Sequence, residues 1–216
     1  MIAWDGVPGW SWWMSNETAV LPPTTVATVY LHLGWSVVLG WLAQRWLGWR
    51  LAWGVAAWCW VPGTGGLAHW LGLAFQSPSL ATVGWCLLSL VVRWRQPQSR
   101  LQMPWALVVS ALALGWLLVA DLLAWFPVSL YAWGFSPAAL ALVALAVLAY
   151  GVAGRAHAAA WATSGGWWWL GAVLCGFAAL RLPSGNVWDA LLDPWLWLVC
   201  HAVLYRRWRT GSDGRN

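Results

Sequence analysis

Long apolar runs, separated by short polar stretches, make up most of the chain. A helix needs about 20 apolar residues to cross the ~30 Å hydrocarbon layer of a bilayer. Runs near this length predict seven membrane-spanning helices, at about 24–43, 46–61, 79–92, 104–126, 137–154, 161–180 and 188–205. The shorter stretch 67–75 predicts a half-length helix on the outer side. We therefore expect an all-α integral membrane protein, with residues 1–216 forming a single polytopic bundle.

The basic residues fall almost entirely on one side of this predicted topology. All 11 Lys and Arg residues are arginine, and Arg181 alone lies on the other side. The remaining arginines are Arg45, Arg50, Arg93, Arg95, Arg100, Arg155, Arg206, Arg207, Arg209 and Arg215. Because cytoplasmic loops accumulate Arg and Lys, the pattern predicts an N-terminus outside and a C-terminus in the cytoplasm.

The composition agrees with a membrane location and argues against a soluble domain. The chain is 62% hydrophobic and 8% charged, whereas a soluble domain has about 25% charged residues. Its net charge of +5 comes from arginines at the ends of apolar runs, which are topology anchors and do not indicate a nucleic-acid surface. The use of arginine without lysine, together with 26 tryptophans, is explained in part by codon choice in a GC-rich genome. We expect a bacterial protein of the inner membrane.

The cysteines predict no metal site. Cys59, Cys86, Cys175 and Cys200 each lie inside an apolar run, and none has a CxxC partner. Free cysteine behaves as a small hydrophobic residue, so we expect four unpaired, buried thiols.

The ends of the third and seventh apolar runs resemble each other. Cys86–Arg95 and Cys200–Arg209 both begin with cysteine, continue with an apolar run and end in Arg and Trp. Each follows a loop containing Pro and Gly, a short apolar piece and a second proline. Two parallel three-helix units joined by a fourth helix, a 3+1+3 repeat, would explain this pattern, and such repeats are typical of transporters. Convergence of membrane-exit sequences on Arg and Trp, without common ancestry, also explains it and is the favoured explanation.

Four polar residues near the predicted outer side are candidates for binding a substrate or a partner: Asp121, Arg181, His69 and Gln76. Asp121 lies within the fourth run, where a carboxylate is costly unless it is paired, protonated or in contact with water. A structural alternative is a buried acid satisfied by Arg181 or by a hydroxyl group. His69 and Gln76 are two helical turns apart, so they are expected to share one face of the half-length helix and to line an outer vestibule.

The last outer loop, 181–197, is the densest polar and aromatic stretch of the chain. Asp189 and Asp193 are candidates for binding there. A helix capped by Ser184 or Asn186, with both acids near its positive end, would instead give them a structural role.

Haem binding has weak support in the sequence. The pair Trp188-Asp189 is similar to part of the Trp-rich outer loops of cytochrome-maturation proteins that handle haem. The longer Trp-Gly-Trp-Asp pattern of that family is missing, so no residue role is transferred, and Trp188 remains a candidate for binding only. His32 and His201 are possible haem ligands, but they lie at different predicted depths. Each is expected to bond to a backbone carbonyl or a hydroxyl group instead.

Three functions remain open at this point. The first, which the nearly unbroken apolar spans favour, is a non-catalytic membrane subunit that packs against lipids and other membrane proteins. The second is a small transporter with a site near the outer vestibule, although carriers usually place more polar residues at mid-span. The third is a haem-handling or other membrane enzyme. A retinal protein is excluded, because the chain has no lysine to form a Schiff base.

Overall fold

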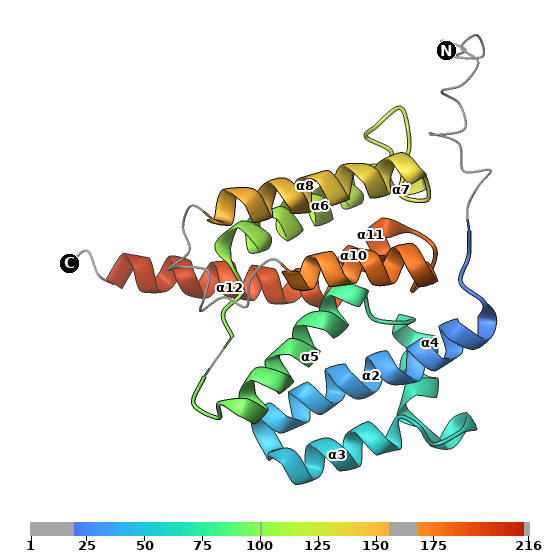
Figure 1. Ribbon diagram of the computed structural model, residues 1–216, viewed down its shortest axis with the longest axis vertical. Coiled ribbons are helices and arrows are strands. Elements are labelled where there is room, and N and C mark those ends of the chain that lie inside the picture. The colour runs from blue at the N-terminus through green and yellow to red at the C-terminus, as the bar shows by residue number, and fades with distance from the viewer. Residues whose placement is uncertain (1–19, 100, 156–167, 214–216) are drawn as a thin grey trace.

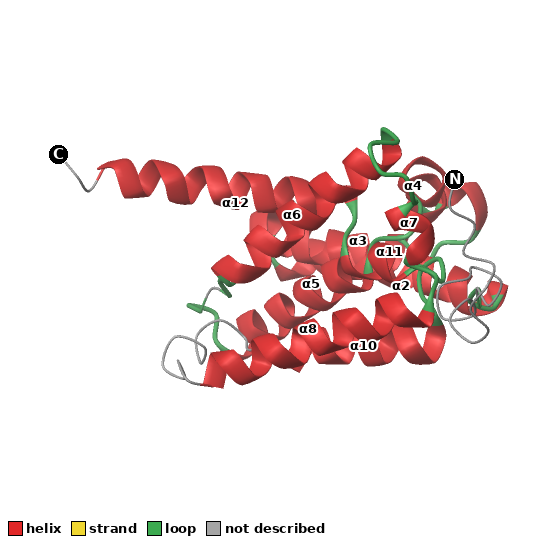
Figure 2. Ribbon diagram, turned by 90° about the horizontal axis from the view of Figure 1, so that it is seen from above, coloured by secondary structure: helices red, strands yellow, loops and turns green. Residues whose placement is uncertain are grey.

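The computed structural model describes residues 20–99, 101–155 and 168–213, and all regular structure within them is helical (Figures 1 and 2). No strand occurs in this part of the chain. The prediction of an all-helical protein is therefore confirmed for the described residues.

The first half of the chain forms four helices. These are α2 (Thr24–Leu47), α3 (Trp49–Trp58), α4 (Leu67–Phe75) and α5 (Leu80–Arg95). Gly48 alone separates α2 from α3, and its φ of 86° lies in a region that glycine adopts without steric cost. The chain can therefore reverse within one residue, and α3 returns along α2 (Figure 1).

The second half begins with α6 (Trp105–Leu122) and the short α7 (Leu130–Trp133). It continues through α8 (Pro137–Arg155), α10 (Trp168–Leu180), α11 (Val187–Leu191) and α12 (Pro194–Asp213). Helix α6 lies against α12, α8 lies against α10, and α10 also contacts α5 of the first half.

Several helix boundaries differ from the predicted ones. The apolar stretch 67–75 is helical as α4, but α3 has 10 residues and α6 ends at Leu122. The predicted helix 188–205 is two helices in the structure, because α11 ends at Leu191 and a separate helix begins at Pro194. Proline lacks a backbone N–H and is favoured in the first turn of a helix, which explains the new start. The short α7 was not predicted.

Two of the described helices have the length and hydropathy needed to cross a membrane. They are α2, with 24 residues, and α6, with 18. The apolar stretches of α8 and α10 are shorter. At 1.5 Å per residue, the 10 residues of α3 extend about 15 Å, roughly half of the hydrocarbon layer. The structure therefore identifies two helices of membrane-spanning length among the described residues, whereas the sequence predicts seven crossings.

The largest core cluster joins the two halves of the chain. Trp85 of α5, Val108 of α6, Trp169 of α10 and Cys200 of α12 are among its buried members. A second cluster around Phe177 fills the space between α8, α10 and α11. Small residues permit close approach at two further places, because a Cβ atom on Gly34 would lie 2.9 Å from Pro78 and one on Gly115 would lie 2.2 Å from Trp197.

Helices α5 and α12 begin 114 positions apart, and helices α2 and α8 begin 113 positions apart. Ser79 caps α5. Asp193, 114 positions later in the sequence, immediately precedes α12. Pro23, which precedes α2, and Pro137, which begins α8, are the same distance apart. The packing of the halves differs, however, since α5 contacts α2 whereas α12 contacts α6.

The helices that carry arginine in their C-terminal halves point the same way. Helices α2, α5, α8 and α12 all end toward the left of Figure 1, and α10 ends toward the right. Arg181 follows the end of α10, so it lies at the opposite end of the molecule from Arg45, Arg93 and Arg207.

Candidate functional site

Asp121 lies in the last turn of α6 and caps the N-terminus of α7. Its Oδ1 accepts a hydrogen bond from the backbone N–H of Leu130 at 2.8 Å. Its Oδ2 accepts from the N–H of Tyr131 at 2.7 Å and from the Ser129 hydroxyl at 3.1 Å. Backbone amides and a hydroxyl group, and not Arg181, therefore satisfy this carboxylate, which gives it a structural role at the end of α6.

Replacing Asp121 with asparagine is expected to lower the free energy of unfolding, because the side-chain amide presents an N–H group where the carboxylate accepted a bond. Unfolding in detergent micelles, followed by tryptophan fluorescence, would measure the change. Ser129→Ala removes one of the three bonds to Asp121 and also the cap that the hydroxyl gives to the Ala132 N–H, so it should lower the free energy of unfolding too. Equal stability of Asp121→Asn and the wild type would contradict this role.

A junction between α7 and α11 fixes the end of the second half. We define it by Leu130, Tyr131, Gly134, Asn186 and Trp188. The Asn186 side-chain amide donates to the Tyr131 carbonyl at 2.9 Å, and the Trp188 indole donates to the Leu130 carbonyl at 2.9 Å. The Asn186 side-chain oxygen accepts from the Trp188 N–H at 2.9 Å and so caps α11. Both side chains are buried, which places Trp188 in the framework of this junction.

Asp189 accepts two hydrogen bonds beside this junction. The Tyr131 hydroxyl donates to it at 2.8 Å, and the Ser184 hydroxyl also donates to it. Burial, together with the hydrogen bond to this carboxylate, raises the pKa of Tyr131 above its usual range. Tyr131 therefore remains a protonated donor, and Asp189 is held in place by two hydroxyl groups.

Asp193 lies at the N-termini of two helices, one from each half of the chain. Its Oδ1 accepts from the N–H of Leu196 in the first turn of α12, at 2.7 Å. Its Oδ2 accepts from the N–H of Ser79, the capping residue of α5, at 2.8 Å. The positive ends of both helix dipoles stabilise the negative charge, so Asp193 links the two halves.

A cavity of about 550 Å³ lies between the end of α4 and the segment that contains α11 and the start of α12. Its polar lining residues are Gln76, Ser77, Ser184, Asp189 and Asp193. The structure thus brings Gln76, Asp189 and Asp193 together in the lining of one cavity. The described lining does not include His69, whose ring lies edge-on to Trp70 at 5.3 Å.

Arg181 follows the last residue of α10 in an unfavourable backbone conformation. Its φ is 54°, in the left-handed region, and its N–H donates to the Phe177 carbonyl at 2.7 Å. Its guanidinium lies over the Phe177 ring, 5.4 Å from the centroid. The carboxylates of Asp121, Asp189 and Asp193 bond to other groups, so the pairing of Arg181 with Asp121 considered above is not present.

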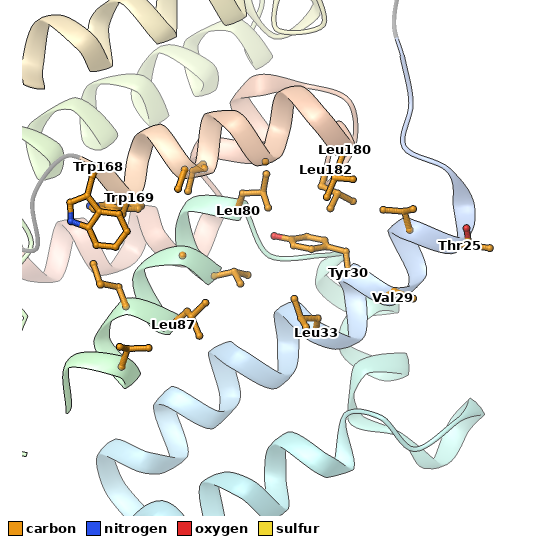
Figure 3. A pocket seen from close by; sticks show the side chains of 18 residues that line it. Thr25, Val29, Tyr30, Leu33, Leu80, Leu87, Trp168, Trp169, Leu180 and Leu182 are labelled. Carbon is orange, nitrogen blue, oxygen red and sulfur yellow. The ribbon is translucent and has the colours of Figure 1, made fainter. Parts of the chain in front are cut away.

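An apolar groove of about 700 Å³ runs between α2, α5 and α10 (Figure 3). Val29 and Leu33 of α2, Leu87 of α5, and Trp168 and Leu180 of α10 are among its lining residues. Both halves of the chain contribute to its walls. A groove of this chemistry can hold hydrocarbon and offers no partners to an ion.

The histidines that were considered as haem ligands bond to backbone carbonyl groups. Nδ1 of His32 lies 2.7 Å from the Cys59 carbonyl oxygen, and Nδ1 of His201 lies 2.9 Å from that of Trp197. The described residues contain no group of three or more His, Cys, Asp or Glu side chains that could hold a metal ion. All four cysteines are free thiols, as predicted, but Cys175 is exposed and not buried.

The residues missed by the sequence analysis are mostly partners of the ones it selected. Tyr131 has no local signal, because its bond to Asp189 joins positions 58 residues apart. Ser79 does have one, since a serine just before an apolar run is a helix N-cap signal.

Comparisons with protein-family models, curated proteins and solved structures found no match.

Proposed function

We propose that this chain is a non-catalytic integral membrane subunit that packs against lipids and partner membrane proteins. The supporting observation is the apolar surface of its helices. On α8, Leu142, Leu145 and Leu148 are exposed by 53%, 64% and 55%. Exposed leucines, valines and tryptophans also occur on α2, α3, α5, α6 and α12. Soluble monomers rarely expose contiguous apolar patches of more than a few hundred Å², so a surface of this kind favours lipid or protein cover.

The proposal includes seven crossings of a bacterial inner membrane, with the arginine-rich helix ends in the cytoplasm. Two parallel units, α2–α5 and α8–α12, would be joined by α6. The interval of 114 positions between Ser79 and Asp193, close to the 113 between the starts of α2 and α8, supports the repeat. The gathering of arginine-bearing ends at one end of the molecule supports the orientation.

Fusion and extraction experiments test the membrane part of this proposal. We expect the protein to stay in the membrane pellet after alkaline carbonate extraction. A green fluorescent protein fused to the C-terminus should fluoresce, whereas alkaline phosphatase fused there should be inactive, because each folds on one side of the inner membrane. Release into the supernatant, or an active phosphatase fusion, would contradict the location or the orientation.

Mild purification from native membranes tests the subunit role. We expect at least one other membrane protein to co-purify at a constant ratio through two chromatography steps. A stable, functional monomer without a partner would contradict this role. A matched purification from membranes that lack the protein identifies any protein that binds the resin directly.

A small carrier is the second candidate, because the 550 Å³ cavity is lined by both halves of the chain and contains Asp189 and Asp193. Both carboxylates already accept two hydrogen bonds from the protein, which limits what they can offer to a solute. Uptake into vesicles that contain the purified protein, compared with empty vesicles, would distinguish a carrier from a subunit.

A further inference from the structure

The non-helical segment that joins α4 to α5 lies at a depth that helix α2 defines. The carbonyl oxygen of Pro78 accepts a hydrogen bond from the Tyr30 hydroxyl at 2.8 Å, and that of Gln76 accepts one from the Trp35 indole at 2.9 Å. Tyr30 and Trp35 follow the first residue of α2 by 6 and 11 positions, or about 9 and 17 Å along the helix. With α2 crossing the membrane, as proposed above, this segment lies within the hydrocarbon layer.

The break between α11 and α12 meets this segment from the other half of the chain. Asp193 accepts a hydrogen bond from the capping residue of α5, and the rings of Phe75 and Trp195 lie edge to face with centroids 5.0 Å apart. Non-helical backbone occurs at membrane depth only where protein buries it or where it lines a water-filled cavity. Residues 74–78 and 192–195 line the 550 Å³ cavity, so we expect this cavity to admit water and polar solutes.

The charge at the wall of this cavity is negative and only partly balanced. The described lining includes Asp189 and Asp193 and no arginine, lysine or histidine. Asp193 lies at the N-termini of α5 and α12, whose partial positive charges of about 0.5 each offset its own. Asp189 has no such partner, because its helix α11 has 5 residues and its described donors are two neutral hydroxyl groups. About one negative charge therefore remains.

One oxygen of Asp189 is available to a ligand. Both hydroxyl groups, from Tyr131 and Ser184, donate to its Oδ2, and its Oδ1 has no donor among the described residues. A carboxylate at membrane depth is costly unless it is paired, protonated or hydrated. A cation at Oδ1 would therefore stabilise Asp189.

Two further features of the lining favour a cation. Ala74, Phe75 and Gln76 lie at the C-terminal end of α4, where the last carbonyl groups of a helix carry partial negative charge. The rings of Phe75 and Trp195 supply aromatic surface, which attracts cations. Aromatic rings suit an ion that carries methyl or methylene groups, whereas a bare metal ion prefers oxygen ligands alone.

We infer that this cavity binds a monovalent organic ammonium ion, with Oδ1 of Asp189 beside the positive charge and the rings of Phe75 and Trp195 against its alkyl groups. This inference rests on the proposed membrane location and adds a ligand to the proposed subunit role. The cavity volume lies within the range of about 300–1,000 Å³ of small-molecule sites. The described residues contain no group of three His, Cys, Asp or Glu side chains that would instead hold a metal ion.

Choline and 3,3-dimethylbutan-1-ol test the charge of the ligand, because they have nearly the same shape and only choline is charged. Calorimetric titration of the purified protein in maltoside micelles would measure the affinity for each. We expect choline to bind at least tenfold more tightly than the neutral alcohol. Equal affinities, or no binding of choline, would overturn the inference. If choline does not bind and the protein stays in the carbonate-resistant pellet, the inference fails and the membrane location stands.

Variants of the lining test the position of the site. Asp189→Asn keeps the shape of the side chain and removes its charge, so we expect at least tenfold weaker choline binding, the scale of one charge-assisted hydrogen bond. Trp195→Leu removes one aromatic ring from a position that is 41% exposed and should weaken binding about threefold to fivefold. Asp121→Asn and Trp125→Leu change the same residue types outside the lining and should leave binding unchanged.

Unfolding curves of all four variants show which of them are folded. Should Asp189→Asn fail to fold, Trp195→Leu carries the test, because the Trp195 indole makes no described hydrogen bond. An unchanged affinity for choline in either folded lining variant would overturn the site. So would an equal loss in Trp125→Leu and Trp195→Leu, because choline would then bind to exposed tryptophans in general.

Discussion

Replacing Gly134 with alanine is expected to destabilise the protein by about 3 kcal/mol, one of the largest effects of a single methyl group in this chain. The added Cβ would lie 2.0 Å from the side-chain oxygen of Asn186 and 2.3 Å from Cδ1 of Trp188. Neither side chain can move away cheaply, because both are buried and each donates a hydrogen bond to α7. Relief of the clash would break at least one of those bonds.

The cause of this destabilisation is steric and not conformational. Gly134 has φ −60° and ψ −16°, values that alanine adopts readily. Gly54→Ala is the matched control, because Gly54 lies in α3 and a Cβ there meets nothing within 4 Å. We expect the control to be neutral or stabilising by up to about 1 kcal/mol. Unfolding in mixed micelles would show both changes, and similar curves for the two variants would refute the close packing of the α7–α11 junction.

The helical character of the chain could be predicted because it depends on local properties. Apolar runs of suitable length identified the helical regions, and the short run 67–75 is helical as α4. Local signals also explain some helix boundaries. Pro194 interrupts an apolar run that otherwise continues from Trp188, and in the structure a separate helix begins at this proline.

The candidate site could be predicted only in part, because its geometry depends on contacts between distant segments. The residue types were informative, since Asp189 and Asp193 line one cavity with Gln76. Their partners were not, because Asp189 bonds to a tyrosine 58 positions away and Asp193 to a backbone amide 114 positions away. Periodicity places a residue on a helix face, but it does not identify the neighbour of that face. His69 illustrates this limit, since it shares a helix with the residues near the cavity and contacts Trp70.

Replacing Asp193 with alanine is the second change from which we expect a large effect, a loss of about 3 kcal/mol. The substitution removes the cap of α12, which contributes about 1 kcal/mol, and a charge-assisted bond to Ser79, which contributes about 1.5–3 kcal/mol. It also leaves the N–H of Ser79, a fully buried residue, without an acceptor. The free energy of unfolding in mixed micelles would give the total.

A serine at the same position separates the two contributions. Asp193→Ser can still cap α12 with its hydroxyl, but this shorter side chain has one oxygen and cannot serve Leu196 and Ser79 together. The difference between serine and alanine then measures the cap, and the difference between the wild type and serine measures the link between the halves. If serine restores the full stability of the wild type, the bond to Ser79 contributes nothing, and apolar contacts such as those of α5 with α10 and α11 join the halves. If serine restores only the cap, one carboxylate stabilises the N-termini of both helices and links the two halves of the chain.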